Sequence, residues 1–410
     1  MERFIGIIGV LLILGIAFLA SNNRKAINYR LVLSGIGLQL FIAVLVLKVP
    51  PVTRFFQLLG TGMQKIEGFA KQGANFVYGG IATSSYDGTV QNYSMPHTFV
   101  FAFNITATII LVCILVAIFY HVGIMQRIVS VIAKAMNFVM RVSGAEALSN
   151  VASAFVGQVE AQVMIRPYLP TMTKSELLAS MSGSLACIAG GILIVYANMG
   201  AKAEYLIAAS LMAAPGALVI SKIVFPETEE SQTMGNVKLE VKSNYSNLID
   251  AISHGAADGF KIAMNVVAML IGFIALIAMI NWILGHIYPE LTLDFIFGKL
   301  FYPIAWSMGI PLQDVGSAAT LLGQKLTVNE FVAFQNLTTK AVPVLTEKGL
   351  LIISIAICGF ANFSSVGMQI GGIGALAPER RTDLAKLGMK ALLCGTLASY
   401  LSATIAGMLI

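Results

Sequence analysis

Charged residues are scarce in this 410-residue sequence. Asp, Glu, Lys and Arg make up only 11% of it, against about 25% in a typical soluble domain, whereas 57% of the residues are hydrophobic. A soluble protein of this length could not cover its surface with so few charges, so apolar residues must face lipid. The net charge of +6 is small and lacks the clustered basic surface that nucleic-acid binding needs. The composition indicates an integral membrane protein whose partner is the lipid bilayer and not a nucleic acid.

Cysteine and histidine are also few, and their positions argue against a metal site. The four cysteines all lie inside apolar runs, without paired or metal-type spacing: Cys113, Cys187, Cys358 and Cys394. The four histidines fall near the ends of apolar runs, and none has a second ligand at helical spacing. The Gly-rich segment 371–374 lacks the preceding strand and the lysine of a phosphate-binding loop. We predict no metal site, no cofactor and no nucleotide-binding loop.

Long apolar runs, by contrast, are frequent. A helix needs about 20 apolar residues to cross the hydrocarbon core of a bilayer. Six clean runs and two interrupted ones have about this length: 4–20, 31–49, 99–120, 203–220, 262–284 and 387–409, with 177–197 and 350–370 interrupted. No small-residue cleavage site follows the first run, so we interpret it as a membrane helix and not as a signal peptide. The sequence predicts an all-α polytopic membrane protein with about eight transmembrane helices.

Basic residues beside the runs predict the orientation in the membrane. They occupy the loop after the first run and the segment before the last run: Arg24, Lys25 and Arg30, then Arg380, Arg381 and Lys386. The positive-inside rule places both segments in the cytoplasm. With an even number of spans, both termini then lie outside the cytoplasm.

The remaining stretches are neither spans nor ordinary loops. Segments 51–78 and 123–140 have the spacing of amphipathic helices in the membrane interface, and the polar segment 226–261 is predicted to be a cytoplasmic connector with a short helix. We divide the chain into four parts: N-terminal spans and interfacial helices at 1–141, a first hairpin with a broken helix and a span at 142–222, the connector and a span at 223–310, and a second hairpin with a broken helix and the last span at 311–410.

One pattern occurs twice. Each copy has a short apolar hairpin with a polar tip, followed by a helix that small and polar residues interrupt at mid-membrane. The tips are Val156-Gly157-Gln158-Val159-Glu160 and Gly323-Gln324 with Asn329-Glu330, and the interruptions lie at 186–191 and 358–365. Non-helical backbone at that depth is tolerated only where it is buried in protein or lines a watery cavity, so we predict re-entrant hairpins. Paired, interrupted segments of this kind mark a transporter's substrate site.

Glu160 and Glu330 are the two acids in this pattern, and each has apolar neighbours. Ionisable residues within a membrane are costly and usually mark substrate or proton paths. A carboxylate suits the hydroxyl groups of a sugar, because it can accept hydrogen bonds from two of them. The alternative is a structural ion pair with Arg166 or Lys325 that locks a hairpin.

Uncharged side chains near the tips and breaks complete the candidate site. The Gln158 amide both donates and accepts hydrogen bonds, as the edge of a nucleobase requires. Asn362 and Ser365, three residues apart on the second broken helix, are candidates for ligand contact or for hydrogen bonds between helices. Phe360 is either a core residue or a wall for an aromatic base.

At these residues the sequence resembles the concentrative nucleoside transporter family. The likeness covers essentially the whole chain, and its main strings are Gly157-Gln158-Val159-Glu160-Ala161, Arg166-Pro167, Lys174-Ser175-Glu176-Leu177, Asn329-Glu330-Phe331-Val332-Ala333 and Cys358-Gly359-Phe360-Ala361-Asn362-Phe363-Ser364-Ser365. The resemblance implies eight membrane helices, two opposed re-entrant hairpins, two unwound helices, a homotrimer and an elevator-like movement of the hairpin domain.

The resemblance also implies roles for the candidate residues. The first hairpin would bind the base through Gln158, Val159 and Glu160. The second hairpin and the second broken helix would bind the ribose through residues matching those of the family: Glu330, Asn362 and Ser365, with Phe360 against the nucleoside. The function expected is secondary active import of nucleosides across the cytoplasmic membrane by cation symport.

Three positions depart from the sodium-coupled pattern of the family. Ser153 stands where sodium-coupled relatives carry Asn, and Cys187 stands where they carry Ser. In those relatives the Asn and Ser side chains ligate sodium. Backbone carbonyls at the positions that match Val156 and Ile188 complete the sodium site there. Sodium prefers oxygen ligands, so a thiol is a poor replacement. At Val159 a hydroxyl residue is usual. We therefore favour proton coupling over sodium coupling, with Glu160 as the proton carrier.

Two other functional classes were weighed against transport. An intramembrane enzyme would use Glu160 and Glu330 as an acid/base pair, but the sequence has no nucleophile-and-base motif and no metal cluster. A channel commonly repeats its filter sequence around a central axis, whereas these two hairpins carry dissimilar polar groups within one chain. Dissimilar groups suit one asymmetric solute, so we predict a transporter and not an enzyme.

Overall fold

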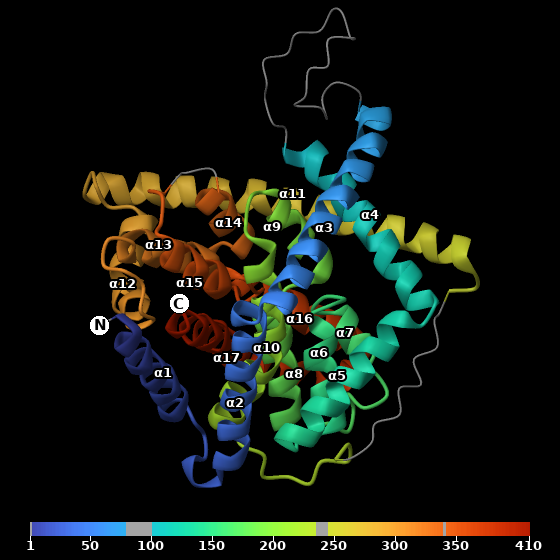
Figure 1. Cartoon of the computed structure of the whole chain (residues 1–410), viewed down its shortest axis with the longest axis horizontal. Helices are drawn as coiled ribbons and strands as arrows, with labels where there is room; N and C mark the ends of the chain where they lie inside the picture. The colour runs from blue at the N-terminus through green and yellow to red at the C-terminus, as the bar shows by residue number, and fades with distance from the viewer. Residues whose placement is uncertain (1, 79–100, 235–244, 339–341) are drawn as a thin grey trace, which may run out of the picture.

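The described part of the chain is helical. The structure is a computed structural model, and it describes residues 2–78, 101–234, 245–338 and 342–410. No strand occurs within these ranges, and the last helix, α17 (Arg381–Met408), is buried along most of its length (Figure 1). The predicted all-α fold is confirmed.

Helices occupy all eight predicted span positions. Six are single helices: α1 (Glu2–Leu19), α2 (Tyr29–Lys48), α4 (Phe101–His121), α10 (Ala203–Val224), α11 (Leu248–Ile287) and α17. The predicted residues 99 and 100 lie outside the described part. Within that part, α2, α10 and Pro378–Met408 are each long and apolar enough to cross a membrane, and α4 with α5 (Ile124–Met140) forms a further candidate bent by 75°. The shorter elements are η1 (Arg24–Ala26), α3 (Pro50–Tyr78), α12 (Leu293–Ser307) and η3 (Pro378–Arg380).

Both predicted hairpins are present. The first consists of α6 (Gly144–Ser153) and the short α7 (Glu160–Val163), and the second of α13 (Val315–Thr327) and α14 (Glu330–Thr338). In each hairpin the candidate glutamate is the first residue of the second arm. Glu160 and Glu330 therefore occupy equivalent positions in the two copies.

Both interrupted spans are broken helices. The first is α8 (Lys174–Ala186) with α9 (Gly190–Asn198), and the second is α15 (Glu347–Ile357) with α16 (Phe363–Leu376). The breaks lie against each other, because the Phe360 N–H donates a 3.3 Å hydrogen bond to the Cys187 carbonyl oxygen. Gly359 has a φ of +151°, and a Cβ there would lie 2.5 Å from the Ala186 carbonyl oxygen. The second break therefore needs glycine where the two unwound segments meet.

Helix α11 is longer than expected. The predicted polar connector at 226–261 contains its first turns, and the helix runs without interruption for 40 residues across the top of the bundle (Figure 1). A Cβ at Gly255 would lie 2.8 Å from Ile114 Cα, and one at Gly259 would lie 2.7 Å from Ile110 Cα, so α4 packs directly on the α11 backbone. The helix expected in the connector is therefore not short, because residues 248–261 are continuous with the following span.

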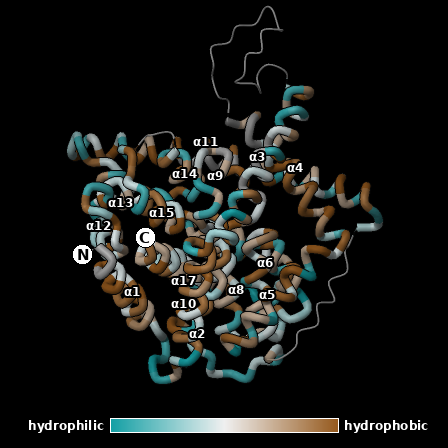
Figure 2. Tube along the Cα trace, viewed as in Figure 1, coloured by the Kyte–Doolittle hydropathy of each residue, from teal (hydrophilic) through white to brown (hydrophobic). Residues whose placement is uncertain are grey.

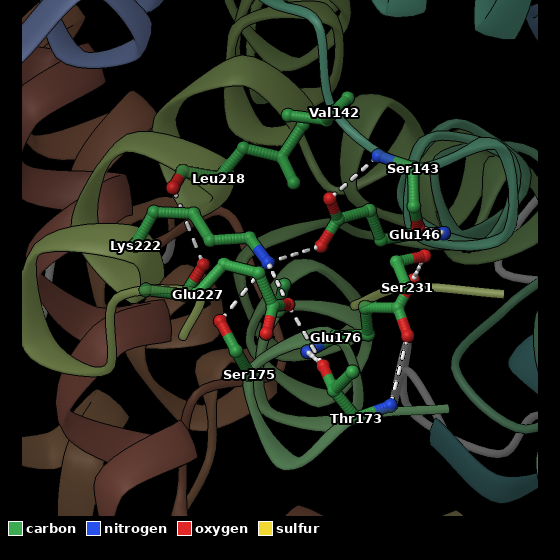
Figure 3. A network of polar contacts seen from close by, with 12 residues as sticks. Val142, Ser143, Glu146, Thr173, Ser175, Glu176, Leu218, Lys222, Glu227 and Ser231 are labelled. Atoms are coloured by element: carbon green, nitrogen blue, oxygen red, sulfur yellow. Dashed lines mark hydrogen bonds and ion pairs between the residues drawn. The ribbon is translucent and has the colours of Figure 1, made fainter. Parts of the chain in front are cut away.

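A buried polar network ties the start of the first hairpin to α8 and α10 (Figure 3). Lys222 near the end of α10 forms ion pairs with Glu146 at 2.7 Å and with Glu227 at 3.3 Å, and it donates to Ser175 Oγ at 3.0 Å. Ser143 and Thr173 cap α6 and α8 through capping boxes. The network anchors the α6 end of the first hairpin to α8 and α10, at the end away from the hairpin tip.

The outer helices carry large exposed apolar side chains. Leu11 on α1 and Leu33 on α2 are 65% and 70% exposed, and Ile271 on α11 is 68% exposed. Figure 2 shows apolar colour along these helices. An apolar outer surface of this extent is the surface that lipid covers in a membrane protein.

Candidate functional site

Glu330 accepts hydrogen bonds on both of its carboxylate oxygens. Tyr196 on α9 donates its hydroxyl to Oε1 at 3.0 Å, and Asn362 donates its Nδ2 to Oε2 at 2.9 Å. All three side chains are buried. The second hairpin is thereby joined to both broken helices at one point.

The orientation of the Asn362 amide follows from its neighbours. Its Oδ1 accepts from the Ser365 backbone N–H at 2.9 Å, which caps α16, and from the Ser364 hydroxyl at 2.7 Å. A backbone N–H can only donate, so the oxygen must face Ser365 and the NH₂ group must face Glu330. The predicted ribose residues Glu330, Asn362 and Ser365 are thus brought together.

Gln158 lies against the middle of α16. Its Nε2 is 3.8 Å from Met368 Sδ, and its Oε1 accepts from Gln369 Nε2 at 3.5 Å. Gln369 also donates to the Met181 carbonyl oxygen at 3.2 Å, which fixes the direction of its amide. Gln369 is fully buried, and its own Oε1 has no partner among the described residues.

Val159 and Glu160 point to different neighbours. A Cβ at Gly372 would lie 2.7 Å from the Val159 side chain, so Val159 packs on α16. The Glu160 carboxylate folds back over Gly157, whose φ is +113°, because a Cβ at Gly157 would lie 2.6 Å from Glu160 Oε2. Within the described residues, no ion pair joins Glu160 to Arg166, which is exposed. The alternative of a structural pair at this hairpin is therefore not realised.

Helix α16 connects the residues around Glu330 with the residues around Gln158. Asn362 caps its start and contacts the second hairpin, and Gln369 seven residues later contacts the first. At a rise of 1.5 Å per residue the two contacts are about 10 Å apart. This separation is comparable with the length of a nucleoside, so one such molecule could contact both groups.

The candidate cation residues Ser153 and Cys187 lie in a neutral network near the tip of the first hairpin. The Ser153 hydroxyl donates to the Ser149 carbonyl oxygen and shares a hydrogen bond with the Ser184 hydroxyl, both at 2.7 Å. Gln162 donates to Ser184 at 2.9 Å. The Cys187 thiol donates to the Asn150 carbonyl oxygen at 3.8 Å. The Ser153 and Cys187 side chains are therefore already engaged with protein atoms.

Two residues of the candidate site, Tyr196 and Gln369, were not predicted from the sequence. Tyr196 lies seven residues beyond the first break and Gln369 lies within an ordinary apolar helix, so neither carries a motif signal. Phe360, by contrast, was expected at the second break, where it is half-buried and its N–H is bonded to Cys187.

Known families and structures match this chain along its length. Residues 205–407 and 8–81 match the C-terminal and N-terminal models of the Na+ dependent nucleoside transporters, and residues 102–203 match a model described as nucleoside recognition. An uncharacterized transporter of Haemophilus influenzae is 41% identical, over 98% of this chain and 97% of the relative. Nucleoside permease NupC of Helicobacter pylori is 37% identical, over 98% and 97%.

A solved structure matches equally well. CNTnw in an inward-facing substrate-bound state has a TM-score of 0.92 to this structure at 39% identity, covering 100% of this chain and 98% of the other. The likeness therefore includes both hairpins and both broken helices.

Proposed function

The chain belongs to the family of concentrative, Na+ dependent nucleoside transporters, and we propose that it imports nucleosides across the cytoplasmic membrane by cation symport. As a member of this family it is a membrane transporter and not an enzyme. The observation that carries the proposal is the meeting of both hairpins at α16, which places Gln158 at one end and Glu330 with Asn362 at the other.

We assign the base to the first hairpin and the ribose to the second. Gln158 offers an amide to the base, with Val159 and Glu160 beside it. Glu330, Asn362 and Ser365 face the sugar, and Phe360 lies against the nucleoside. A carboxylate and an amide match the two neighbouring hydroxyl groups of ribose, because they accept and donate at adjacent positions.

The coupling ion we favour is the proton, with Glu160 as its carrier. A carboxyl group without a paired cation can take up and release a proton, and no cation is paired with Glu160 in the described residues. The candidate sodium ligands Ser153 and Cys187 are engaged elsewhere, and Val156 and Ile188 offer only backbone carbonyls. Sodium coupling is the alternative, and the family description supports it.

The assembly and orientation are proposed from the family and from the charges. We infer a homotrimer with an elevator-like movement of the hairpin domain, and both termini outside the cytoplasm. The basic residues Arg24 and Lys25, before α2, and Arg380 and Arg381, at the start of α17, face the cytoplasm in this orientation.

Uptake of labelled uridine and inosine into proteoliposomes tests the proposal. Sodium and pH are varied independently. We expect accumulation above equilibrium in sodium-free buffer with an inward proton gradient. Strong sodium dependence without a pH response would refute proton coupling, and equilibration without accumulation would indicate a channel.

A further inference from the structure

Gln369 on α16 lies where the first hairpin tip and the first broken helix meet. Its side chain is fully buried, and its Nε2 donates to the Met181 carbonyl oxygen of α8 at 3.2 Å. A carbonyl oxygen can only accept, so the NH₂ group of Gln369, and not its Oε1, must point to this place. The direction of the Gln369 amide is therefore set by the backbone of α8, which cannot turn as a side chain can.

The same NH₂ group faces the side chain of Gln158 at the hairpin tip. Gln369 Nε2 lies 3.5 Å from Gln158 Oε1, at which distance the hydrogen bond is weak. The reversed arrangement is worse, because it would place the NH₂ group of Gln158 against that of Gln369. Gln158 therefore turns its oxygen towards Gln369 and its NH₂ group away from it.

The NH₂ group of Gln158 is only weakly bonded to α16. Gln158 Nε2 lies 3.8 Å from the thioether sulfur of Met368, an exposed side chain. A thioether is a weak acceptor, so a carbonyl oxygen of a bound molecule would be a better partner for this NH₂ group. The neighbouring Val159 has no hydrogen-bonding side chain and packs on Gly372. At this point of the tip, the group that Gln158 offers to a ligand is a donor.

Nucleobases differ in what they present to such a donor. Uracil and hypoxanthine carry a carbonyl group on the ring, and its oxygen accepts hydrogen bonds. Cytosine and adenine carry an amino group at the same ring position, which donates. An amino group facing the Gln158 NH₂ group places donor against donor, unless the Gln158 amide turns and gives up its bond to Gln369.

We propose that Gln369 is a specificity-determining residue: by holding the oxygen of Gln158, it selects nucleosides whose base carries a carbonyl group over those whose base carries an amino group at that position. This inference rests on the proposed function, because it names the class of nucleoside that the first hairpin takes. Gln369 does not itself touch the base and acts through Gln158.

The selectivity is measured as two ratios of KM in proteoliposomes, cytidine to uridine and adenosine to inosine. The members of each pair have the same sugar and experience the same driving force, so each ratio isolates the exchanged groups of the base. In the wild type we expect both ratios to be roughly three to ten, which is the cost of turning the Gln158 amide. A ratio of one or below in either pair would overturn the inference.

Two substitutions of Gln369 test its part in this selectivity. Gln369→Leu removes the fixed donor, so the Gln158 amide can turn either way and both ratios should fall towards one. Gln369→Glu places an oxygen where the nitrogen stands, which favours the NH₂ group of Gln158 as its neighbour, so the ratios should fall at least as far. A folded Gln369 variant that keeps both wild-type ratios would refute the role of Gln369.

A second background shows whether Gln369 acts through Gln158. Gln158→Ala removes the selecting amide, so adding Gln369→Leu to it should leave the ratios unchanged. A further change of the ratios in this background would contradict the inference. Should the Gln369 variants fail to fold, the wild-type ratios, which need no substitution, still decide.

Gln39→Leu is the matched control. Gln39 is a fully buried glutamine on α2, and its Nε2 also donates to a backbone carbonyl oxygen, that of Met212 at 3.0 Å, and to Ser402 Oγ at 2.9 Å. Its loss should lower the thermal stability in detergent and leave both ratios unchanged. A change as large as that of Gln369→Leu would mean that the ratios report loosened packing, and the inference would fall.

Failure of the inference and failure of the proposed function give different results. If the wild type takes up none of the four nucleosides, the proposed function fails and the inference fails with it. If the wild type accumulates all four with equal KM, the proposed function stands and only the selection by Gln369 is refuted.

Discussion

The two repeats share an architecture and differ in their chemistry. Each has a hairpin whose second arm begins with a glutamate, and each has a helix that breaks beside a cysteine. Near the tip of the first hairpin the hydrogen-bonded side chains Ser153, Ser184 and Gln162 are neutral, and the Glu160 carboxylate lies over Gly157. In the second repeat, Glu330 is hydrogen-bonded to Tyr196 and Asn362.

This difference supports the different tasks that we propose for the two acids. A carboxyl group fixed by two neighbouring side chains is suited to recognition of hydroxyl groups. A carboxyl group without a partner cation can exchange a proton as its surroundings change. In this proposal the same fold element serves substrate binding in one half and coupling in the other.

The largest expected effect comes from Glu330→Gln. The amide replaces one acceptor oxygen by an NH₂ group, which faces the donor Tyr196 or Asn362 and cannot accept from a ribose hydroxyl, so we expect uptake to fall roughly 100-fold or more. Initial rates of uridine uptake measure this. Glu347→Gln is the matched control, because the Glu347 side chain is 74% exposed and forms a surface ion pair with Lys202. Near-normal uptake by the Glu330 variant would remove the sugar role of the second hairpin.

Glu160→Gln should separate binding from coupling. The amide keeps the size of the side chain but carries no proton. We expect exchange of labelled for unlabelled uridine to continue, while accumulation driven by a proton gradient is lost. Accumulation that persists in sodium-free buffer would show that another group carries the proton, and the contrast between the two acids would disappear.

Tyr196→Phe tests the fixed donors around Glu330. Removing one hydrogen bond to a charged group costs about 1.5 kcal/mol or more, which corresponds to roughly tenfold in KM for uridine. The change for 2′,3′-dideoxyuridine should be much smaller. An equal rise for both substrates would mean that Tyr196 supports the fold and not the sugar site.

Gln369→Leu should produce the smallest effect, on the base side. It removes the donor that fixes the Gln158 amide, a neutral hydrogen bond worth about 0.5–1 kcal/mol, so KM should change by roughly threefold. The change should differ between uridine and inosine, whose base edges differ. A panel of nucleosides measures this, and a uniform change across the panel would contradict the assignment of the base to Gln158.

The sequence predicted the helices and breaks that surround the site better than the side-chain contacts within it. Apolar run lengths located the spans, and the repeated small and polar residues located both breaks and the first hairpin tip. At the second tip Asn329 and Glu330 were expected correctly, whereas Gly323 and Gln324 lie within helix α13.

The direction of a side chain depends on which helix packs against it, and the sequence around the residue does not show which helix that is. Tyr196 and Gln369 look like ordinary residues of apolar helices. Val159, which was expected to contact the nucleobase, packs against Gly372. The polar composition of 226–261 indicates a connector with a short helix, and it does not show that Gly255 and Gly259 pack on α4 within one long helix.

A structure of the transporter with bound uridine is the most direct measurement. The account predicts that the ribose hydroxyls lie within hydrogen-bond distance of Glu330 and Asn362, and that the uracil ring lies beside Gln158 and Phe360. A nucleoside bound in the reverse direction, or away from α16, would contradict the assignment of the base to the first hairpin and of the ribose to the second.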